Sequence, residues 1–126
     1  MQITDKPKHT EQQWHTICSK DSLIENSGVG AIILTKNAPK ELAKQVAIFH
    51  VPDAEPSIYA VGNYDPIGQA NVLCRGIVGS VGEEVVVASP IFKQHFNLVN
   101  GQCLEQDVCV DTYQVRVCDN LVQLFV

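Results

Sequence analysis

The feature that most restricts the fold of this chain is a series of short apolar runs ended by glycine, proline, asparagine or aspartate. The runs are rich in β-branched residues, which favours strands over helices. The segments between them lack the length and the 3.6-residue period that a stable helix needs. Many short strands without a long helix are typical of small sandwiches and barrels, so the sequence predicts an all-β fold. The nine expected strands are WHTICS (14–19), GAIILT (30–35), QVAIFHV (45–51), PSIYAV (56–61), EEVVVAS (83–89), HFNLV (95–99), QCLE (102–105), TYQVRVC (112–118) and LVQLFV (121–126).

Two turn sequences predict hairpins between neighbouring strands. Asn100–Gly101 separates HFNLV from QCLE, and Asp119–Asn120 separates the last two strands. Asn-Gly tolerates the positive φ angles of a two-residue type I′ turn. A third local signal, Ser22 followed by Glu25, has the spacing of a capping box. It predicts either one helical turn or a plain polar turn in KDSLIEN (20–26).

The chain is long enough for one domain and too short for two, because 126 residues fall within the common size of a single domain. Residues 1–13 are polar and show no period, which predicts a flexible leader. Residues 14–126 are then expected to form a single β domain. The connection KNAPKELAK (36–44) contains helix-forming residues, but Pro39 and the shortness of the segment leave room for one helical turn at most.

Charge and composition argue against several classes of partner and location. The net charge of -5 disfavours binding to nucleic acid. No run of eighteen apolar residues is present, which argues against a membrane-spanning helix, and no apolar secretory signal follows the first lysines. The five cysteines are odd in number and include no Cys-x-x-Cys pair, which indicates free thiols in a reducing compartment. The expected location is the cytoplasm.

No group of residues has the spacing of a self-contained active site. The four histidines and five cysteines include no local signature that joins a nucleophile to a base. Glu83 and Glu84 are neighbours in an expected strand, so their side chains are predicted to face opposite sides as edge charges. Gly28 and Gly30 precede a strand, whereas a phosphate-binding loop opens a helix. The residues alone predict no catalytic group and no metal site.

Two long connections resemble the cluster-binding loops of the Rieske iron–sulfur fold in their order, flanking strands and separation. They are AVGNYDPIGQANVLCRGIVG (60–79) and VVVASPIFKQHFNLVNGQCLE (85–105). The resemblance implies a small Rieske-like β-sandwich or barrel with two long loops at one tip. In that family the first loop carries Cys-x-His and the second Cys-x-x-His. Here the ligand positions fall on Asp65, Ile67, Ser89 and Phe92.

These four residues are chemically unsuited to hold a Rieske cluster. The cluster needs two thiolates on one iron and two imidazoles on the other. Aspartate and serine offer hard oxygen donors, and isoleucine and phenylalanine offer no donor at all. The sequence therefore predicts that the chain binds neither a 2Fe-2S cluster nor any other metal or cofactor.

Further motifs are similar to the small subunit of bacterial NAD(P)H-dependent nitrite reductase, from Trp14 to Val126. They are QWHTICS (13–19), AIF (47–49), IYAVGNYDP (58–66), CRGIVG (74–79), VVASP (86–90), KQHFNL (93–98), NGQCLE (100–105) and TYQVRVCDNLVQL (112–124). The resemblance implies a cytoplasmic enzyme that reduces nitrite to ammonium. It also implies that the large subunit holds FAD, sirohaem and an iron–sulfur cluster. The small subunit would then have no catalytic residue and a structural or regulatory role.

The same resemblance places the docking site for the large subunit at the tip formed by the two loops. Whether Ile67 and Phe92 pack together or lie exposed is open at this stage. The expected docking residues combine an apolar centre with a polar rim: Asp65, Ile67, Arg75, Ile91, Phe92, Lys93, Gln94 and His95.

Two alternative functions remain on the sequence alone. One is an independent binding module that uses the Rieske-like fold without the nitrite reductase partner. The other is an electron-transfer 2Fe-2S ferredoxin with unusual ligands, drawn from Asp65, Cys74, Ser89 and His95. Ligand chemistry disfavours the second, because iron–sulfur clusters are held mostly by thiolates.

Overall fold

The structure, a computed structural model, describes residues 12–34 and 43–126. The expected flexible leader, apart from its last two residues, and most of the 36–44 connection lie outside the described residues. The described chain is almost entirely strands and loops, which confirms the all-β prediction. No helix among these residues is long and apolar enough to cross a membrane. The strands are β1 (Trp14–Ser19), β2 (Ser27–Ile33), β3 (Lys44–His50), β4 (Ile58–Gly62), β5 (Tyr64–Asp65), β6 (Ala70–Asn71), β7 (Ile77–Val81), β8 (Glu84–Ala88), β9 (His95–Asn97), β10 (Thr112–Cys118) and β11 (Leu121–Phe125), and the 3₁₀ turns are η2 (Lys20–Ser22) and η4 (Leu73–Arg75).

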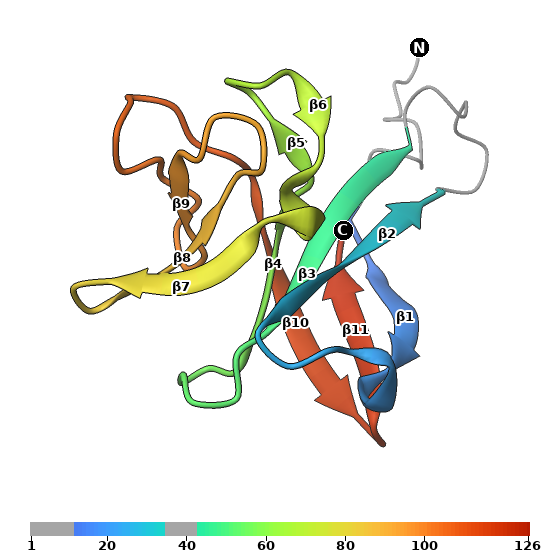
Figure 1. Ribbon diagram of the computed structural model, residues 1–126. Helices are drawn as coiled ribbons and strands as arrows, with labels where there is room; N and C mark the ends of the chain where they lie inside the picture. Colours follow the sequence, from blue (N-terminus) through green and yellow to red (C-terminus); the bar gives the residue numbers. More distant parts are fainter. Residues whose placement is uncertain (1–11, 35–42) are drawn as a thin grey trace, which may run out of the picture.

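The strands form three antiparallel sheets. The largest has six strands in the order β1-β11-β10-β4-β3-β2, and a three-stranded sheet of β7, β8 and β9 lies beside it (Figure 1). The third is the short β5–β6 pair, which belongs to the first long connection. In Figure 1 this pair and the connection after β8 lie together in the upper part of the molecule. The two connections therefore meet at one tip, as the resemblance implies.

Strand β3 has both faces buried and lies between two hydrophobic cores. Val46 and Ile48 point into a core shared with β11, whereas Ala47 and Phe49 point into a second core shared with β8 and β9. All four side chains are 0% exposed. Successive side chains of a strand alternate between its faces, so an unbroken apolar run fits a strand that is covered on both sides. This strand couples the two larger sheets.

One of the two predicted hairpin turns is confirmed and the other is wrong. Asp119 and Asn120 have φ angles of 52° and 62° and join β10 to β11, as a type I′ turn requires. The Asn100–Gly101 turn is instead longer, because the backbone N–H of Gly101 donates to the carbonyl of Asn97 at 2.8 Å. The Asn97 side chain also accepts hydrogen bonds from the N–H groups of Val99 and Asn100.

Other local expectations need correction. The helical turn lies at Lys20–Ser22, and its cap is Ser19, whose hydroxyl accepts from the Asp21 N–H at 3.2 Å; the Ser22–Glu25 capping box is not formed. The expected strand 102–105 is reduced to isolated bridges, such as Phe96 with Cys103. The first long connection contains β5, β6 and β7, three strands beyond the nine expected.

Candidate functional site

The tip consists of two five-residue turns of the same construction, Asp65–Gln69 in the first connection and Ser89–Lys93 in the second. In each, the backbone N–H of the fifth residue donates to the carbonyl of the first, at 2.7 Å for Gln69 and 3.0 Å for Lys93. Both fifth residues have positive φ angles, 59° and 63°. The second residue of each is proline, whose fixed φ angle favours a turn at that position.

The first side chain of each turn holds its own backbone. Asp65 Oδ1 accepts hydrogen bonds from the N–H groups of Ile67 at 2.8 Å and Gly68 at 3.0 Å. Ser89 Oγ accepts from the Ile91 N–H at 3.3 Å. Aspartate and serine commonly form such local bonds, which explains why both turns begin with one of these residues.

A direct hydrogen bond joins the two turns at their first residues. Ser89 Oγ donates to Asp65 Oδ2 at 2.5 Å, and both residues are 0% exposed. The Asp65 carboxyl group therefore accepts three hydrogen bonds, one of them from the other loop. Hydrogen bonds to a carboxylate are shorter and stronger than those between neutral groups. Two of the four expected ligand positions thus link the loops directly.

Ile91 closes the contact between the loops by packing on Gly68. A Cβ atom at Gly68 would lie 2.6 Å from Ile91 Cδ1, 3.0 Å from Ile91 Cβ and 2.9 Å from Asp65 Oδ2. These distances leave no space for a side chain, so glycine is needed here for close approach. Gly68 was not singled out in the sequence because its partner belongs to the other loop.

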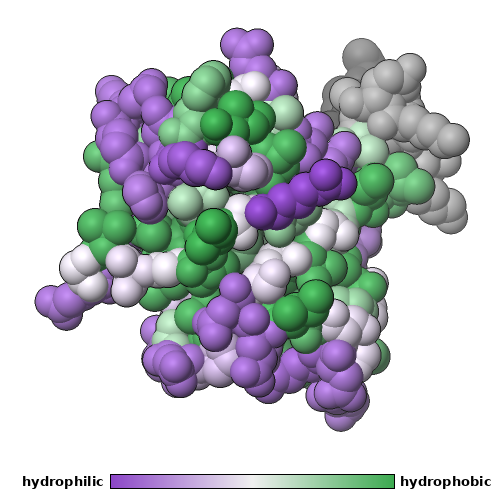
Figure 2. All heavy atoms as spheres, in the orientation of Figure 1, coloured by the Kyte–Doolittle hydropathy of each residue, from purple (hydrophilic) through white to green (hydrophobic). Residues whose placement is uncertain are grey.

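Only some of the residues expected to form the docking surface are exposed at the tip. Phe92 is 61% exposed and Ile91 38% exposed, while the basic residues Arg75 and Lys93 are also exposed. In the view of Figure 2, apolar spheres at the top of the molecule are bordered by polar ones. Asp65 is fully buried and therefore supports the loops from inside.

Ile67 and Phe92 have different surroundings. Ile67 is half-buried and packs against the core beneath the tip. Phe92 points outward and does not pack against this core. Gln94 is also half-buried, and within the described residues its Oε1 atom is buried without a hydrogen-bond partner.

Both the sequence and the fold resemble those of known proteins. Residues 13–125 match the family described as Rieske-like [2Fe-2S] domain. The nitrite reductase (NADH) small subunit of Salmonella typhimurium is 38% identical over 113 residues, which cover 89% of this chain and 96% of that protein. The chain belongs to the nitrite reductase small-subunit family of Rieske-like domains.

Two further relatives extend this assignment. The solution structure of the nitrite reductase [NAD(P)H] small subunit from Erwinia carotovora has 36% identity and a TM-score of 0.67, covering 90% of this chain and 81% of that one. The nitrite reductase [NAD(P)H] large subunit of Klebsiella oxytoca is 33% identical over 89% of this chain, which corresponds to 11% of that protein. In that relative, a segment like this small subunit is part of the large polypeptide.

The family description names a 2Fe-2S cluster, but the residues at the ligand positions of this small subunit do not fit one. The side-chain oxygen atoms of Asp65 and Ser89 are already joined by a hydrogen bond. The side chains of Ile67 and Phe92 have no atom that could bind iron. A Rieske centre needs sulfur and imidazole ligands. We therefore assign no step in a reaction to a cluster at this tip.

The alternative ligand set of a ferredoxin is not brought together either. Cys74 Sγ lies against β2, 3.1 Å from where a Cβ of Gly30 would be, and the His95 ring is bound by Glu105. In the part of the chain that the structure describes, no three His, Cys, Asp or Glu side chains are grouped to hold a metal ion.

Glu105 is a residue of this site that no sequence pattern indicated. Its carboxylate accepts from the backbone N–H of His95 at 2.8 Å and lies 2.6 Å from His95 Nδ1. The backbone hydrogen bond from His95, followed by the bond and charge of its side chain, lowers the pKa of Glu105. Glu105 follows His95 by ten residues in an irregular loop, so no spacing rule connects them. This pair fixes the loop that follows the tip.

Proposed function

We propose that this protein is the small, non-catalytic subunit of a cytoplasmic NAD(P)H-dependent nitrite reductase, which reduces nitrite to ammonium. In this proposal the large subunit carries FAD, sirohaem and an iron–sulfur cluster, and the small subunit has a structural or regulatory role. The observation that carries the proposal is the Asp65–Ser89 hydrogen bond, because it closes the two loops without cluster ligands.

Association with the large subunit is supported by the Klebsiella relative, in which a homologous segment belongs to the large polypeptide. When a domain is fused to a larger chain in one protein, its separate homologue in another protein commonly binds the homologue of that larger chain. The exposed tip offers apolar Ile91 and Phe92 beside basic Arg75 and Lys93. An apolar centre with a charged rim is typical of an interface, so we place the docking surface there.

The absence of a cluster is tested on the purified full-length chain. We expect no visible absorption and no stoichiometric iron after expression with iron and sulfide available. The chain alone should not reduce nitrite with NADH or NADPH, and it should bind the large subunit when the two are mixed. Two irons per chain with a visible spectrum would support the ferredoxin alternative. A clean failure to bind the large subunit would favour the independent binding module.

The docking surface is tested by placing charges on the tip. Phe92→Asp and Lys93→Glu should weaken binding to the large subunit by roughly tenfold or more, as expected for central interface residues. Ile24→Asp is a matched control, because Ile24 is also 61% exposed but lies between η2 and β2. Lys20→Glu is the matched control for Lys93→Glu. Tip variants that stay folded and bind as tightly as the wild type would show that the docking site lies elsewhere.

A further inference from the structure

Strand β7 (Ile77–Val81) forms one edge of the three-stranded sheet. It pairs with β8 on one side, and no backbone hydrogen bond joins it to any other segment that the structure describes. In Figure 1 the β7–β8 hairpin projects from the body of the molecule. An edge strand presents a row of unpaired N–H and C=O groups, on which a further strand can pair.

The backbone groups that point outward from this edge can be identified from the turn. The turn between β7 and β8 has two residues, so its flanking residues Val81 and Glu84 form a hydrogen-bonded pair. Hydrogen-bonded pairs alternate with non-hydrogen-bonded pairs along an antiparallel ladder. The N–H and C=O groups of Val78 and Ser80 therefore point away from β8, toward the free edge.

This edge lacks the features that usually keep edge strands from pairing. Natural edges commonly carry a charged residue, a proline or a bulge. The sequence of β7, IVGSV, has no charge and no proline, and its register with β8 runs without a shift. Ile77 is 72% exposed and Val81 44% exposed. Between them, a Cβ atom at Gly79 would meet no atom within 4 Å, so the strand is open to a neighbour.

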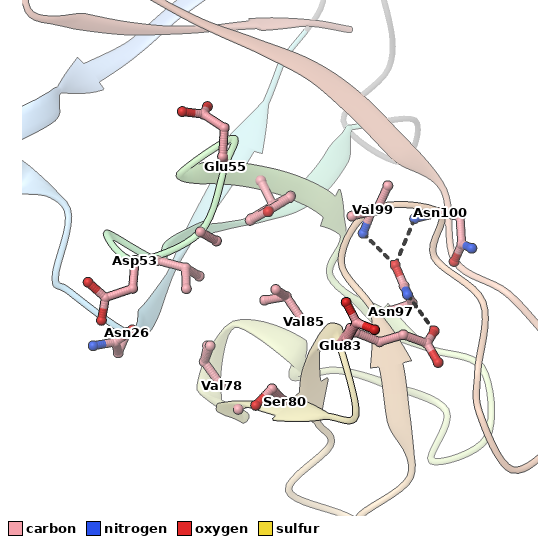
Figure 3. A pocket seen from close by; sticks show the side chains of 15 residues that line it. Asn26, Asp53, Glu55, Val78, Ser80, Glu83, Val85, Asn97, Val99 and Asn100 are labelled. Atoms are coloured by element: carbon pink, nitrogen blue, oxygen red, sulfur yellow. Dashed lines mark hydrogen bonds between the residues drawn. The ribbon is translucent and has the colours of Figure 1, made fainter.

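The two faces of β7 have different surroundings. Val78 and Ser80 line a groove between the hairpin and the 51–57 turn that joins β3 to β4 (Figure 3). Successive side chains alternate, so Ile77, Gly79 and Val81 lie on the opposite, outer face. In Figure 2 the surface over the hairpin is pale and green, with hydrophilic atoms at its end.

The two ends of β7 are flanked by opposite charges. Arg75 lies two residues before the strand and Glu83 two residues after it. Both are exposed, and neither makes an ion pair within residues 12–34 and 43–126. The prediction that Glu83 and Glu84 face opposite sides of a strand is wrong, because Glu83 lies in the turn before β8 and both residues line the groove.

The segment RGIVGSVGE (75–83) is complementary to itself when two copies run antiparallel. With Gly79 of one copy opposite Gly79 of the other, each residue faces the residue that lies equally far beyond Gly79 in the second copy. Arg75 then faces Glu83 of the second copy, and this pair occurs at both ends of the contact. Opposite charges in facing positions favour pairing.

The same register satisfies the free backbone groups. It pairs Val78 of one copy with Ser80 of the other, and these are the residues whose N–H and C=O groups point outward. Ile77 then faces Val81 in the closer, non-hydrogen-bonded position, where the two side chains can pack. Backbone, apolar contacts and charge thus agree on one register.

We propose that β7 pairs with β7 of a second copy of this chain, which joins the two three-stranded sheets across a two-fold axis at Gly79. Each copy uses its own β7 edge, so the contact closes at two chains. A contact of one short strand is small, so the dimer should be weak and depend on concentration. It involves this chain alone and therefore goes beyond the proposed function, and the two turns of the tip lie outside it.

Sedimentation of the full-length chain from micromolar to millimolar concentration tests the association. We expect a reversible shift from monomer to dimer. NMR contacts between the methyl groups of Ile77 and Val81 should appear with the dimer. Within one chain, four residues of strand hold these groups about 13 Å apart, so such contacts must join two copies. A chain that stays monomeric at millimolar concentration overturns the inference.

The register is tested by exchanging the charges. Arg75→Glu and Glu83→Arg should each weaken the dimer roughly tenfold, because like charges then meet at both ends. The two changes combined restore opposite charges and should bring the dimer to within about threefold of wild type. Lys20→Glu and Asp107→Arg are matched controls at exposed positions outside the hairpin, and they should have little effect. A double variant that dimerises no better than either single variant would show that the proposed register is wrong.

Ser80→Pro removes an outward N–H group without removing a hydrogen bond to β8. Proline is tolerated on the free side of an edge strand. The variant should therefore keep the cooperative unfolding of wild type and lose the dimer. Ser80→Ala keeps the N–H group and should dimerise like wild type. A folded Ser80→Pro variant that still dimerises would place the contact elsewhere, and the charge exchange decides the question if this variant does not fold.

Discussion

At the scale of single residues, the tip depends on one hydroxyl group. Ser89 donates the hydrogen bond that reaches Asp65 from the other loop, in a place with no exposure to water. Ser89→Ala leaves one oxygen of a buried carboxyl group without its donor, which should lower the free energy of unfolding by about 1–3 kcal/mol. Urea unfolding followed by circular dichroism measures the change. Phe92→Ala is the control and should stay within about 0.5 kcal/mol, since Phe92 is 61% exposed.

The Glu105–His95 pair predicts a pH dependence. The folded-state pKa of Glu105 lies below its ordinary value of 4.5, because the His95 backbone N–H and side chain favour the carboxylate. A depressed pKa means that the pair stabilises the fold above pH 4.5 and that this contribution is lost as the pH falls through the folded-state pKa. The difference in unfolding free energy between wild type and Glu105→Gln should therefore decrease as the pH falls below 4.5. A difference that grows in acid would contradict the assigned role.

At the scale of elements, the two turns of the tip are held by close contact as well as by hydrogen bonds. Gly68→Ala places a methyl group against Ile91 and Asp65, so the loops must separate. We expect a loss of about 1–3 kcal/mol, as for other overpacked sites. Gly79→Ala is a matched control, because a Cβ there meets no atom within 4 Å. In a strand, that change should be neutral or slightly stabilising. Equal unfolding midpoints for the two variants would show that the Gly68 contact relaxes without cost.

Elements whose geometry depends on neighbouring residues were predictable from the sequence. The Asp119–Asn120 turn and the unbroken apolar run of β3 are examples, since a local pattern decides each. The Asn100–Gly101 turn shows the limit: the Asn97 side chain captures two N–H groups, and this lengthens the turn. The Asp65–Ser89 bond joins residues 24 positions apart, and Gly68 meets Ile91 across the same gap between loops. Resemblance located both loops, but only the folded chain shows what joins them.

At the scale of the whole molecule, two regions carry opposite local charge in a chain with a net charge of -5. The exposed bases Arg75 and Lys93 belong to the two tip connections, while Asp53, Glu55, Glu83 and Glu84 line a groove at the far end of β8. The first region was predictable from the sequence by resemblance. The second was not, because the acidic residues come from two segments that only the fold brings together. Both regions depend on β8 keeping its place against the larger sheet.

The shared position of β3 predicts that the two larger sheets unfold as one unit. Phe49 of β3 packs in the same core as Val87 of β8, while Ile48 faces the core of β11. Val87→Ala should therefore lower the free energy of unfolding by roughly 1–3 kcal/mol. The unfolding midpoint of the six-stranded sheet should fall together with that of the three-stranded sheet that contains Val87. The single tryptophan, Trp14 in β1, reports on unfolding of the six-stranded sheet by fluorescence. NMR signals of Val86 and Phe96 report on unfolding of the three-stranded sheet. Val117→Ala, at a half-exposed position of β10, should move neither midpoint appreciably. Coincident transitions in wild type and in Val87→Ala are the expected result, and a Trp14 transition that does not follow the change at Val87 would show that the sheets unfold independently.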